Sequence, residues 1–116
     1  MNVIRFKEIA QIPAFHEDVS DPGVMKKILL RRADLFAGHI QMINWATLLP
    51  GKTFTKHFHE NMQEVFIMMG DGVVARVEGK EFTLFGGDAL VVDVKESHEM
   101  KNPGKVPIEY IVIGIA

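Results

Sequence analysis

Two histidines stand one residue apart in the stretch HFHENMQE, and a glutamate ends it; these are His57, His59 and Glu64. On a strand, side chains at positions i and i+2 point to the same face, so the two imidazoles are predicted to project together. Glu64 opens the apolar run EVFIMM, and a four-residue loop would bring its carboxylate back beside them on a paired strand. Imidazole nitrogens and a carboxylate oxygen are typical ligands of first-row transition metals.

The same stretch also fits two surface histidines and a solvated glutamate, and an isolated H-x-H would favour that interpretation. His98 changes the balance because it lies in a second stretch, GDALVVDVKESHEMKN, which has a spacing of its own. The two remaining histidines, His16 and His39, have no partner at ligand spacing. They are expected to be surface or structural residues.

Short apolar segments separated by turn residues make up most of the chain. Strands are predicted over residues 39–49, 64–69, 73–77, 81–85, 89–94 and 107–116, with a tight hairpin across Glu78-Gly79-Lys80. The first thirty residues are ambiguous, although residues 2–6 could form a strand. No segment combines helix caps with a sustained 3.6-residue period. Strands at this spacing predict an all-β fold, either a sandwich or a small barrel.

Composition bounds the class of protein. A chain of 116 residues is long enough for one domain, and 47% hydrophobic with 24% charged residues is ordinary for a globular protein. The absence of cysteine excludes disulfides, thiolate metal ligands and cysteine nucleophiles. No apolar run has membrane-spanning length and the first residues lack a signal-peptide core, so no membrane contact and a cytoplasmic location are expected.

Charge gives no case for a nucleic-acid partner, because the formal net charge is -2. The one basic cluster lies in MKKILLRR, residues 25–32. It is predicted to be a solvated strand face.

Together, the two histidine-containing stretches resemble the cupin family, in particular the small single-domain cupins of the RmlC-like superfamily. The first cupin motif is, in words, glycine, five residues, H-x-H, three or four residues, glutamate, six residues, glycine. Gly51, His57, His59 and Glu64 fit it position for position. The closing glycine departs, because Gly70 follows after five residues and Gly72 after seven.

The second cupin motif is glycine, five residues, P-x-G, two residues, histidine, three residues, asparagine. Gly87, His98 and Asn102 match it. Asp93 stands where the proline is usual and Lys95 where the glycine is usual. These changes concern the turn before His98 and leave the histidine itself in place.

The resemblance implies a double-stranded β-helix, or jelly-roll barrel, spanning residues 1–116 as one cupin domain. Residues 36–116 would form the barrel that carries both motifs, and residues 1–35 would supply N-terminal strands used in a homodimer. It also implies that His57, His59, Glu64 and His98 ligate one divalent transition metal. Mn, Fe, Ni, Zn, Co and Cu all suit a site of nitrogen and oxygen ligands without thiolate.

Strand parity extends the argument to the barrel interior. If the four candidate ligands face inward, so do Thr55, Phe66, Met68 and Met100. These residues are predicted to line a pocket beside the metal, although a small barrel can also fill its interior with side chains. Gln41, Asn44, Arg76 and Tyr110 are further polar candidates whose orientation the sequence leaves open.

Two classes of function remain. The first is a metal-dependent enzyme, of oxygenase type, acting on a small and partly apolar molecule. With a redox-inert metal, isomerisation, epimerisation or decarboxylation is the alternative chemistry. The second class is a non-catalytic cupin that binds a small ligand, for example a sugar-like one.

Overall fold

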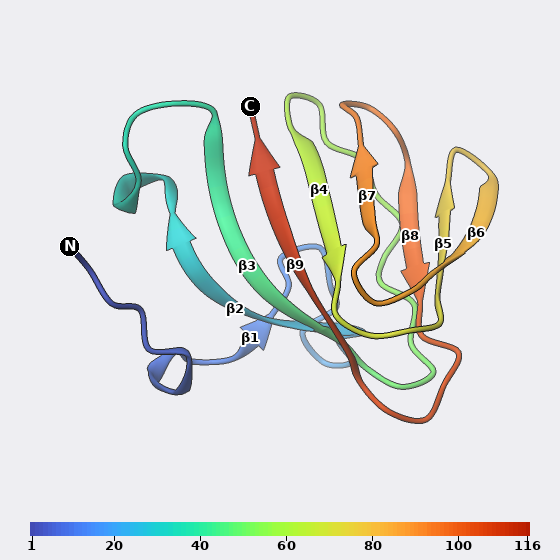
Figure 1. Ribbon diagram of the computed structural model, residues 1–116. Helices are drawn as coiled ribbons and strands as arrows, with labels where there is room; N and C mark the ends of the chain where they lie inside the picture. Colours follow the sequence, from blue (N-terminus) through green and yellow to red (C-terminus); the bar gives the residue numbers. More distant parts are fainter.

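Nine strands and two single-turn 3-10 helices make up the computed structural model, which describes residues 1–116 (Figure 1). The strands are β1 (Ile12–Pro13), β2 (Val24–Arg31), β3 (Ile40–Leu48), β4 (Gln63–Met68), β5 (Val73–Val77), β6 (Lys80–Leu84), β7 (Ala89–Val92), β8 (His98–Lys101) and β9 (Ile108–Ile115). The helices are η1 (Phe6–Glu8) and η2 (Arg32–Asp34). Both helices are single turns, so neither could span a membrane.

The strands form two antiparallel sheets. The larger sheet has the order β1-β2-β3-β9-β4-β7 and the smaller one the order β6-β5-β8. Two isolated bridges, Thr53 to Lys101 and His57 to His98, attach the segment before β4 to the edge of the smaller sheet. Figure 1 shows the long strands β2, β3 and β9 curving away from the smaller sheet at the end where the chain terminates. This arrangement is the all-β jelly roll predicted from the sequence.

The register of the larger sheet places inward-facing residues in rows across the strands. The first row is Val24, Leu48 and Ile108, and the second is Lys26, Ala46, Tyr110 and Met68. The third row is Ile28, Asn44, Val112 and Phe66, and the fourth contains Met42, Gly114 and Glu64. Every residue of the first two rows is buried. The rows therefore lead from an apolar end of the barrel to the candidate ligand Glu64.

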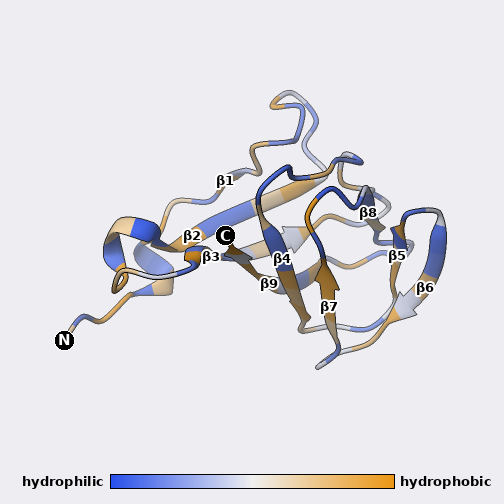
Figure 2. Ribbon diagram, turned by 90° about the horizontal axis from the view of Figure 1, so that it is seen from above, coloured by the Kyte–Doolittle hydropathy of each residue, from blue (hydrophilic) through white to orange (hydrophobic).

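The core occupies the apolar end. Leu48, Val73 and Ala75 are completely buried there, and Phe54 is 1% exposed. Figure 2 shows hydrophobic residues along most of β9 in the middle of the larger sheet, and hydrophilic residues at the β5–β6 turn on the edge of the molecule.

The hairpin predicted across Glu78-Gly79-Lys80 is confirmed. Val77 pairs with Lys80, so Glu78 and Gly79 form a two-residue loop. Their φ angles are 49° and 78°, and positive φ at both positions is typical of the type I′ turn that suits the twist of a hairpin.

Two local expectations were wrong. Residues 2–6 do not form a strand, because residues 1–5 have no regular structure and η1 begins at Phe6. The basic cluster of residues 25–32 is not a uniformly solvated face either. β2 alternates, and its second inward position is Lys26, which is buried. The charge of a side chain does not decide its face when strand parity and pairing turn it inward.

Candidate metal centre

The four candidate ligands reach one place from different elements. His57 and His98 pair through two backbone hydrogen bonds, of 3.2 and 2.9 Å, at the bridge between the two segments. His59 follows two residues later in the loop, and His98 begins β8. Glu64 belongs to β4, which pairs with β7 and β9. The expected pairing of the Glu64 strand with the histidine segment is therefore wrong, and Glu64 approaches from the larger sheet.

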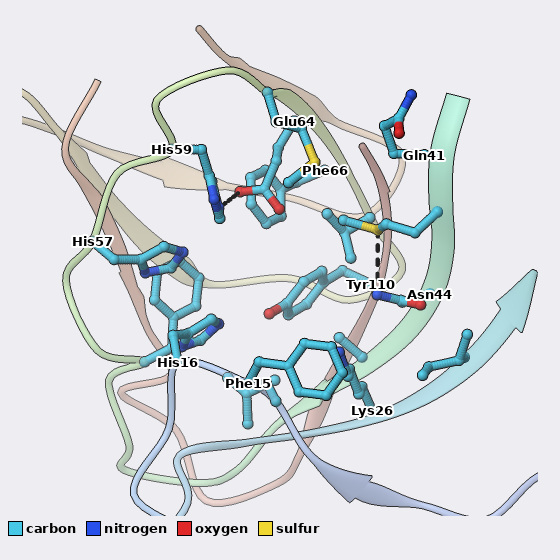
Figure 3. Close-up of a pocket in the computed structure, with 18 of the residues that line it drawn as sticks. Phe15, His16, Lys26, Gln41, Asn44, His57, His59, Glu64, Phe66 and Tyr110 are labelled. Carbon is cyan, nitrogen blue, oxygen red and sulfur yellow. Dashed lines mark hydrogen bonds and ion pairs between the residues drawn. The ribbon is translucent and has the colours of Figure 1, made fainter. Parts of the chain in front are cut away.

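The ligand atoms of these residues converge. One nitrogen or oxygen atom from each of His57, His59, Glu64 and His98 lies within 4.8 Å of the others. Glu64 Oε1 is 2.9 Å from His59 Nε2 and 3.2 Å from His98 Nε2. Figure 3 shows His57, His59 and Glu64 around the same side of the cavity. His98 is 1% and Glu64 6% exposed, so two of the four residues are buried.

Backbone carbonyls orient two of the imidazoles. His98 Nδ1 contacts the carbonyl oxygen of Glu96 at 3.0 Å, and His57 Nδ1 contacts the carbonyl oxygen of Thr55. A proton on each Nδ1 then leaves Nε2 with its lone pair free, the arrangement found in histidines that bind metals.

Three atoms of the cluster are buried without a hydrogen-bond partner: His59 Nε2, Glu64 Oε1 and His98 Nε2. Buried polar atoms in proteins are normally paired, because leaving one unpaired costs free energy. A single cation would satisfy all three atoms at once. The donor set, three imidazoles and one carboxylate, fits a divalent transition metal.

The pKa values of two members of the cluster, His57 and Glu64, favour the protonation states that bind metals. Burial lowers the pKa of His57 to about 4, which keeps its imidazole neutral at neutral pH. Burial alone would raise the pKa of the Glu64 carboxyl. The nearby imidazoles, that of His98 first and then those of His59 and His57, outweigh it and place that pKa below its usual range. A neutral imidazole and an ionised carboxylate are the forms that ligate a metal.

A cavity of about 540 Å³ adjoins the cluster. It is lined by 19 residues, 11 of them hydrophobic, and includes His57, His59 and Glu64 in its wall. The cluster is therefore accessible from the cavity side.

Comparison with known proteins agrees with this geometry. The family model described as the cupin domain matches residues 44–114. This chain belongs to the cupin family. The cupin is 32% identical over 76 residues to the tetracenomycin polyketide synthase protein TcmJ of Streptomyces glaucescens, covering 66% of the chain and 47% of that protein. It is 33% identical over 67 residues to an oxalate-binding protein of Thermotoga maritima, covering 57% of the chain and 54% of that protein.

The chain thus spans about half the length of these two curated relatives. Among solved structures, it resembles a predicted oxalate decarboxylase from Thermotoga maritima with a TM-score of 0.83 and 26% sequence identity. That match covers 98% of each chain.

Only one of the four residues predicted by parity to line the pocket lies in the cavity wall of the cupin. Phe66 does so. Met68 and Met100 face inward as parity requires, but they lie in the hydrophobic core and are 1% exposed. Thr55 is exposed and contributes a backbone N–H to Glu17 instead. Parity predicts the face of a strand and not the depth along the barrel at which the cavity ends.

Three of the four further polar candidates, Gln41, Asn44 and Tyr110, line the cavity. Arg76 is exposed on the smaller sheet, where it forms ion pairs with Glu81 and Glu99. Asn44 Oδ1 is buried and lacks a hydrogen-bond partner, so it can accept a hydrogen bond from a ligand.

One wall of the cavity comes from the N-terminal segment, which the sequence did not connect to the site. The His16 ring stacks on the His57 ring at 4.1 Å between centroids and 19° between planes. Glu17 holds this segment in place. Its carboxylate accepts hydrogen bonds from the backbone N–H groups of Gly23, at 2.6 Å, and Thr55, at 2.8 Å. It also contacts His16 Nδ1 at 2.8 Å. His16 therefore has a structural role, one of the two expected for it, although its side chain is still 25% exposed. His39 is exposed and contacts the carbonyl of Ala116.

The departure from the second cupin motif at Lys95 has a structural counterpart. Lys95 has φ of 65°, in the left-handed region that favours glycine, the residue usual at that place in the motif. The turn therefore keeps its conformation without glycine. Asn102, which ends the motif, is completely buried and donates its amide to the carbonyls of Leu48 and Val106. It therefore joins the end of β3 to the loop before β9.

Proposed function

We propose that this cupin is a metal-dependent enzyme of oxygenase type, acting on a small, partly apolar molecule bound in the cavity. His57, His59, Glu64 and His98 would hold one divalent transition metal. The observation that carries the proposal is the convergence of four ligand atoms within 4.8 Å of one another, with three of their residues in the wall of a cavity of about 540 Å³. A closed structural site would have no reason to face such a space.

Different groups of the chain have different roles at the proposed metal site. The carbonyls of Thr55 and Glu96 orient two imidazoles, and Glu64 supplies the negative charge of the site. The metal, when bound, supplies a Lewis acid and, for a redox-active ion, a centre that reacts with dioxygen. Phe54, Phe66 and Val112 give the cavity apolar walls that exclude water and accept the body of the substrate.

Metal content is the first test. Elemental analysis of untagged wild-type protein is expected to give about one transition metal ion per chain. His59→Ala is expected to abolish it, whereas His39→Ala, at an exposed histidine outside the cluster, is expected to retain it. Wild-type protein that contains no metal and binds none on addition would refute the metal centre.

Oxygen uptake tests the reaction class. Protein loaded separately with Fe, Mn, Ni, Co, Cu or Zn is mixed under air with diketone, catechol, flavonol and thiol substrates. Oxygen consumption that requires both the substrate and an intact His59 is the expected result. No consumption with any combination would contradict the oxygenase assignment while leaving the metal centre intact.

Metal-assisted decarboxylation is the second candidate. It is favoured by the relative named as an oxalate-binding protein and by the similar structure described as a predicted oxalate decarboxylase. Release of carbon dioxide from oxalate without oxygen consumption would select it. Saturable ligand binding with no turnover of any kind would instead select a non-catalytic binding protein.

We also propose that the cupin forms a homodimer through residues 1–35. This segment carries several exposed apolar side chains, among them Ile4, Phe6 and Val19. Burying them against a second copy would remove apolar area from water. Sedimentation equilibrium is expected to give twice the chain mass of 13.1 kDa, and deletion of residues 1–10 is expected to weaken the association.

A further inference from the structure

A lysine lies inside the cavity without a negative partner. Lys26 is 7% exposed, lines the cavity and forms no ion pair. Its ammonium group lies over the Phe15 ring, whose centroid is 3.3 Å from Nζ. Figure 3 shows the Lys26 side chain rising from β2 towards that ring. A buried ammonium group without a carboxylate or hydrogen-bonding partner is costly, so it is normally paired.

The carboxylates nearest the cavity are already engaged. Glu64 lies among the histidines of the cluster, and Glu17 is held by backbone N–H groups and His16. Neither forms an ion pair with Lys26, although Glu64 attracts its charge at longer range and Arg31 repels it. The Lys26 ammonium group therefore faces the cavity without a carboxylate in contact with it.

Tyr110 supplies a second hydrogen-bond donor on the same row. Lys26, Ala46 and Tyr110 are consecutive inward residues across β2, β3 and β9. Tyr110 is 2% exposed to solvent and lines the cavity. Burial raises its pKa, so the hydroxyl keeps its proton at neutral pH. Figure 3 shows the hydroxyl pointing into the cavity.

The residue between the two donors leaves room for a ligand. Ala46 has the smallest side chain in its row, and it lies at the cavity wall. Strands two places apart in a sheet are roughly 10 Å apart, a gap that a bound group of a few atoms can bridge from the ends of a lysine and a tyrosine. The surrounding wall is aromatic and aliphatic, including Phe15, Phe54 and Phe66.

We propose that Lys26 and Tyr110 form an anion-binding subsite, and that the ligand is a small organic acid with an apolar body. Its carboxylate, or an equivalent anionic oxygen, accepts hydrogen bonds from both residues. The body lies against the phenylalanines and extends towards the metal-binding cluster. The proposal rests on the proposed function only in placing the reacting end of the ligand at that cluster. A body of aryl size suits a cavity of about 540 Å³ better than a two-carbon acid such as oxalate.

The test uses benzoate, phenylacetate and 3-phenylpropionate, each against its neutral amide, because the amide keeps the shape and removes the charge. Binding is measured by isothermal titration calorimetry on metal-stripped protein, so that a metal cannot capture the carboxylate. At least one acid is expected to bind about tenfold or more tightly than its amide, as charge-assisted hydrogen bonds provide.

Lys26→Met is expected to abolish the preference for the acid, and Tyr110→Phe to reduce it. The matched control is Lys27→Met on the same strand, since Lys27 Nζ contacts the carbonyl of Phe6 and does not line the cavity. This control is expected to keep the preference. Lys26→Met is also expected to keep or raise the melting temperature, because it removes an unpaired buried charge. Lys26→Gln gives the same comparison if the methionine variant does not fold.

His59→Ala separates this proposal from the proposed function. The variant is expected to lose metal and to keep the acid preference in the metal-free assay. A preference lost in His59→Ala but kept in Lys26→Met would place the anion at the cluster and overturn the subsite. Equal binding of acids and amides, or no binding of any of the three acids, would overturn it as well.

Discussion

The two ends of the barrel use the same strands for opposite purposes. At one end, the row Val24, Leu48 and Ile108 closes the interior with aliphatic side chains. Along the same strands, the following rows contain Lys26, Ala46 and Asn44, and the interior opens into the cavity. The closed end has few polar groups to satisfy, whereas the cavity end holds four buried atoms without partners. Successive inward-facing rows are two residues apart along each strand, so the packed end and the cavity end are only a few residues apart.

The difference between the ends shows why a small barrel can carry a costly site. Unpaired buried atoms and an unpartnered lysine are unfavourable, and the packed end must offset them. The separation predicts that substitutions at the closed end mainly change folding stability, and that substitutions of cavity-lining residues mainly change binding.

The largest effect on stability is expected at the closed end. Leu48→Ala removes a side chain that is 0% exposed, and it should lower the free energy of unfolding by about 3–5 kcal/mol through lost burial and a residual cavity. Urea denaturation measures the loss, and elemental analysis of the folded variant is expected to show unchanged metal content. A variant that loses its metal while it is still folded would break the separation.

At the cavity end, Glu64→Gln keeps the shape of the side chain and removes its charge. Metal affinity is expected to fall by roughly 100-fold or more, since losing a partner of a ligand already costs 10- to 100-fold. The unfolding free energy of metal-free protein should change far less than in Leu48→Ala. Glu60→Gln, at an exposed residue of the same loop, is the control and should bind metal as the wild type does.

Two alanines sharpen the comparison. Ala75 is completely buried in the core, so Ala75→Leu should overpack it and cost about 1–3 kcal/mol. Ala46 lines the cavity, so Ala46→Leu should cost less than about 1 kcal/mol and block ligand binding. Thermal unfolding and ligand titration of both variants check this. Equal destabilisation by the two would mean that the space beside Ala46 is not available to a side chain.

Glu17 links the N-terminal segment to the cavity end, and Glu17→Gln should cost about 1–2 kcal/mol at neutral pH through weakened hydrogen bonds. Burial alone would raise the pKa of this carboxyl, but the N–H groups of Thr55 and Gly23 and the contact with His16 place it below its usual 4.5. A carboxyl whose pKa is lowered in the folded state stabilises that state fully above pH 4.5. This stabilisation is lost as the pH falls through the lowered pKa of the folded state.

The difference between wild type and Glu17→Gln should therefore shrink in acid. Urea denaturation at neutral pH and at successively lower pH values measures it. A difference independent of pH would show that the ionised carboxylate does not hold the segment.

The smallest effect is expected at the turn before His98. Lys95→Gly should raise the unfolding free energy by about 0.5–1 kcal/mol, because glycine adopts the positive φ of 65° without steric cost. Lys105→Gly, at an exposed loop residue without positive φ, is the control and should not stabilise. Thermal unfolding compares the two, and equal effects would argue against strain at Lys95.

Much of this cupin follows from local patterns. The alternation of apolar residues predicted the positions of the main strands, and Glu78-Gly79 predicted a hairpin that the register confirms. The strands and the hairpin depend on spacing along the chain and on strand parity, which are properties of the sequence itself. The grouping of His57, His59, Glu64 and His98 came instead from the resemblance of the two motifs to those of cupins, and the structure brings the four within 4.8 Å.

Other features depended on the tertiary structure. His16 stacks on His57 across 41 residues, and no local spacing connects them. The inward position of Lys26 and the depth at which the cavity ends follow from the pairing of β2, β3, β9 and β4. Strand parity predicts which residues share a face, but only the long-range register decides which of them fill the core and which line the cavity.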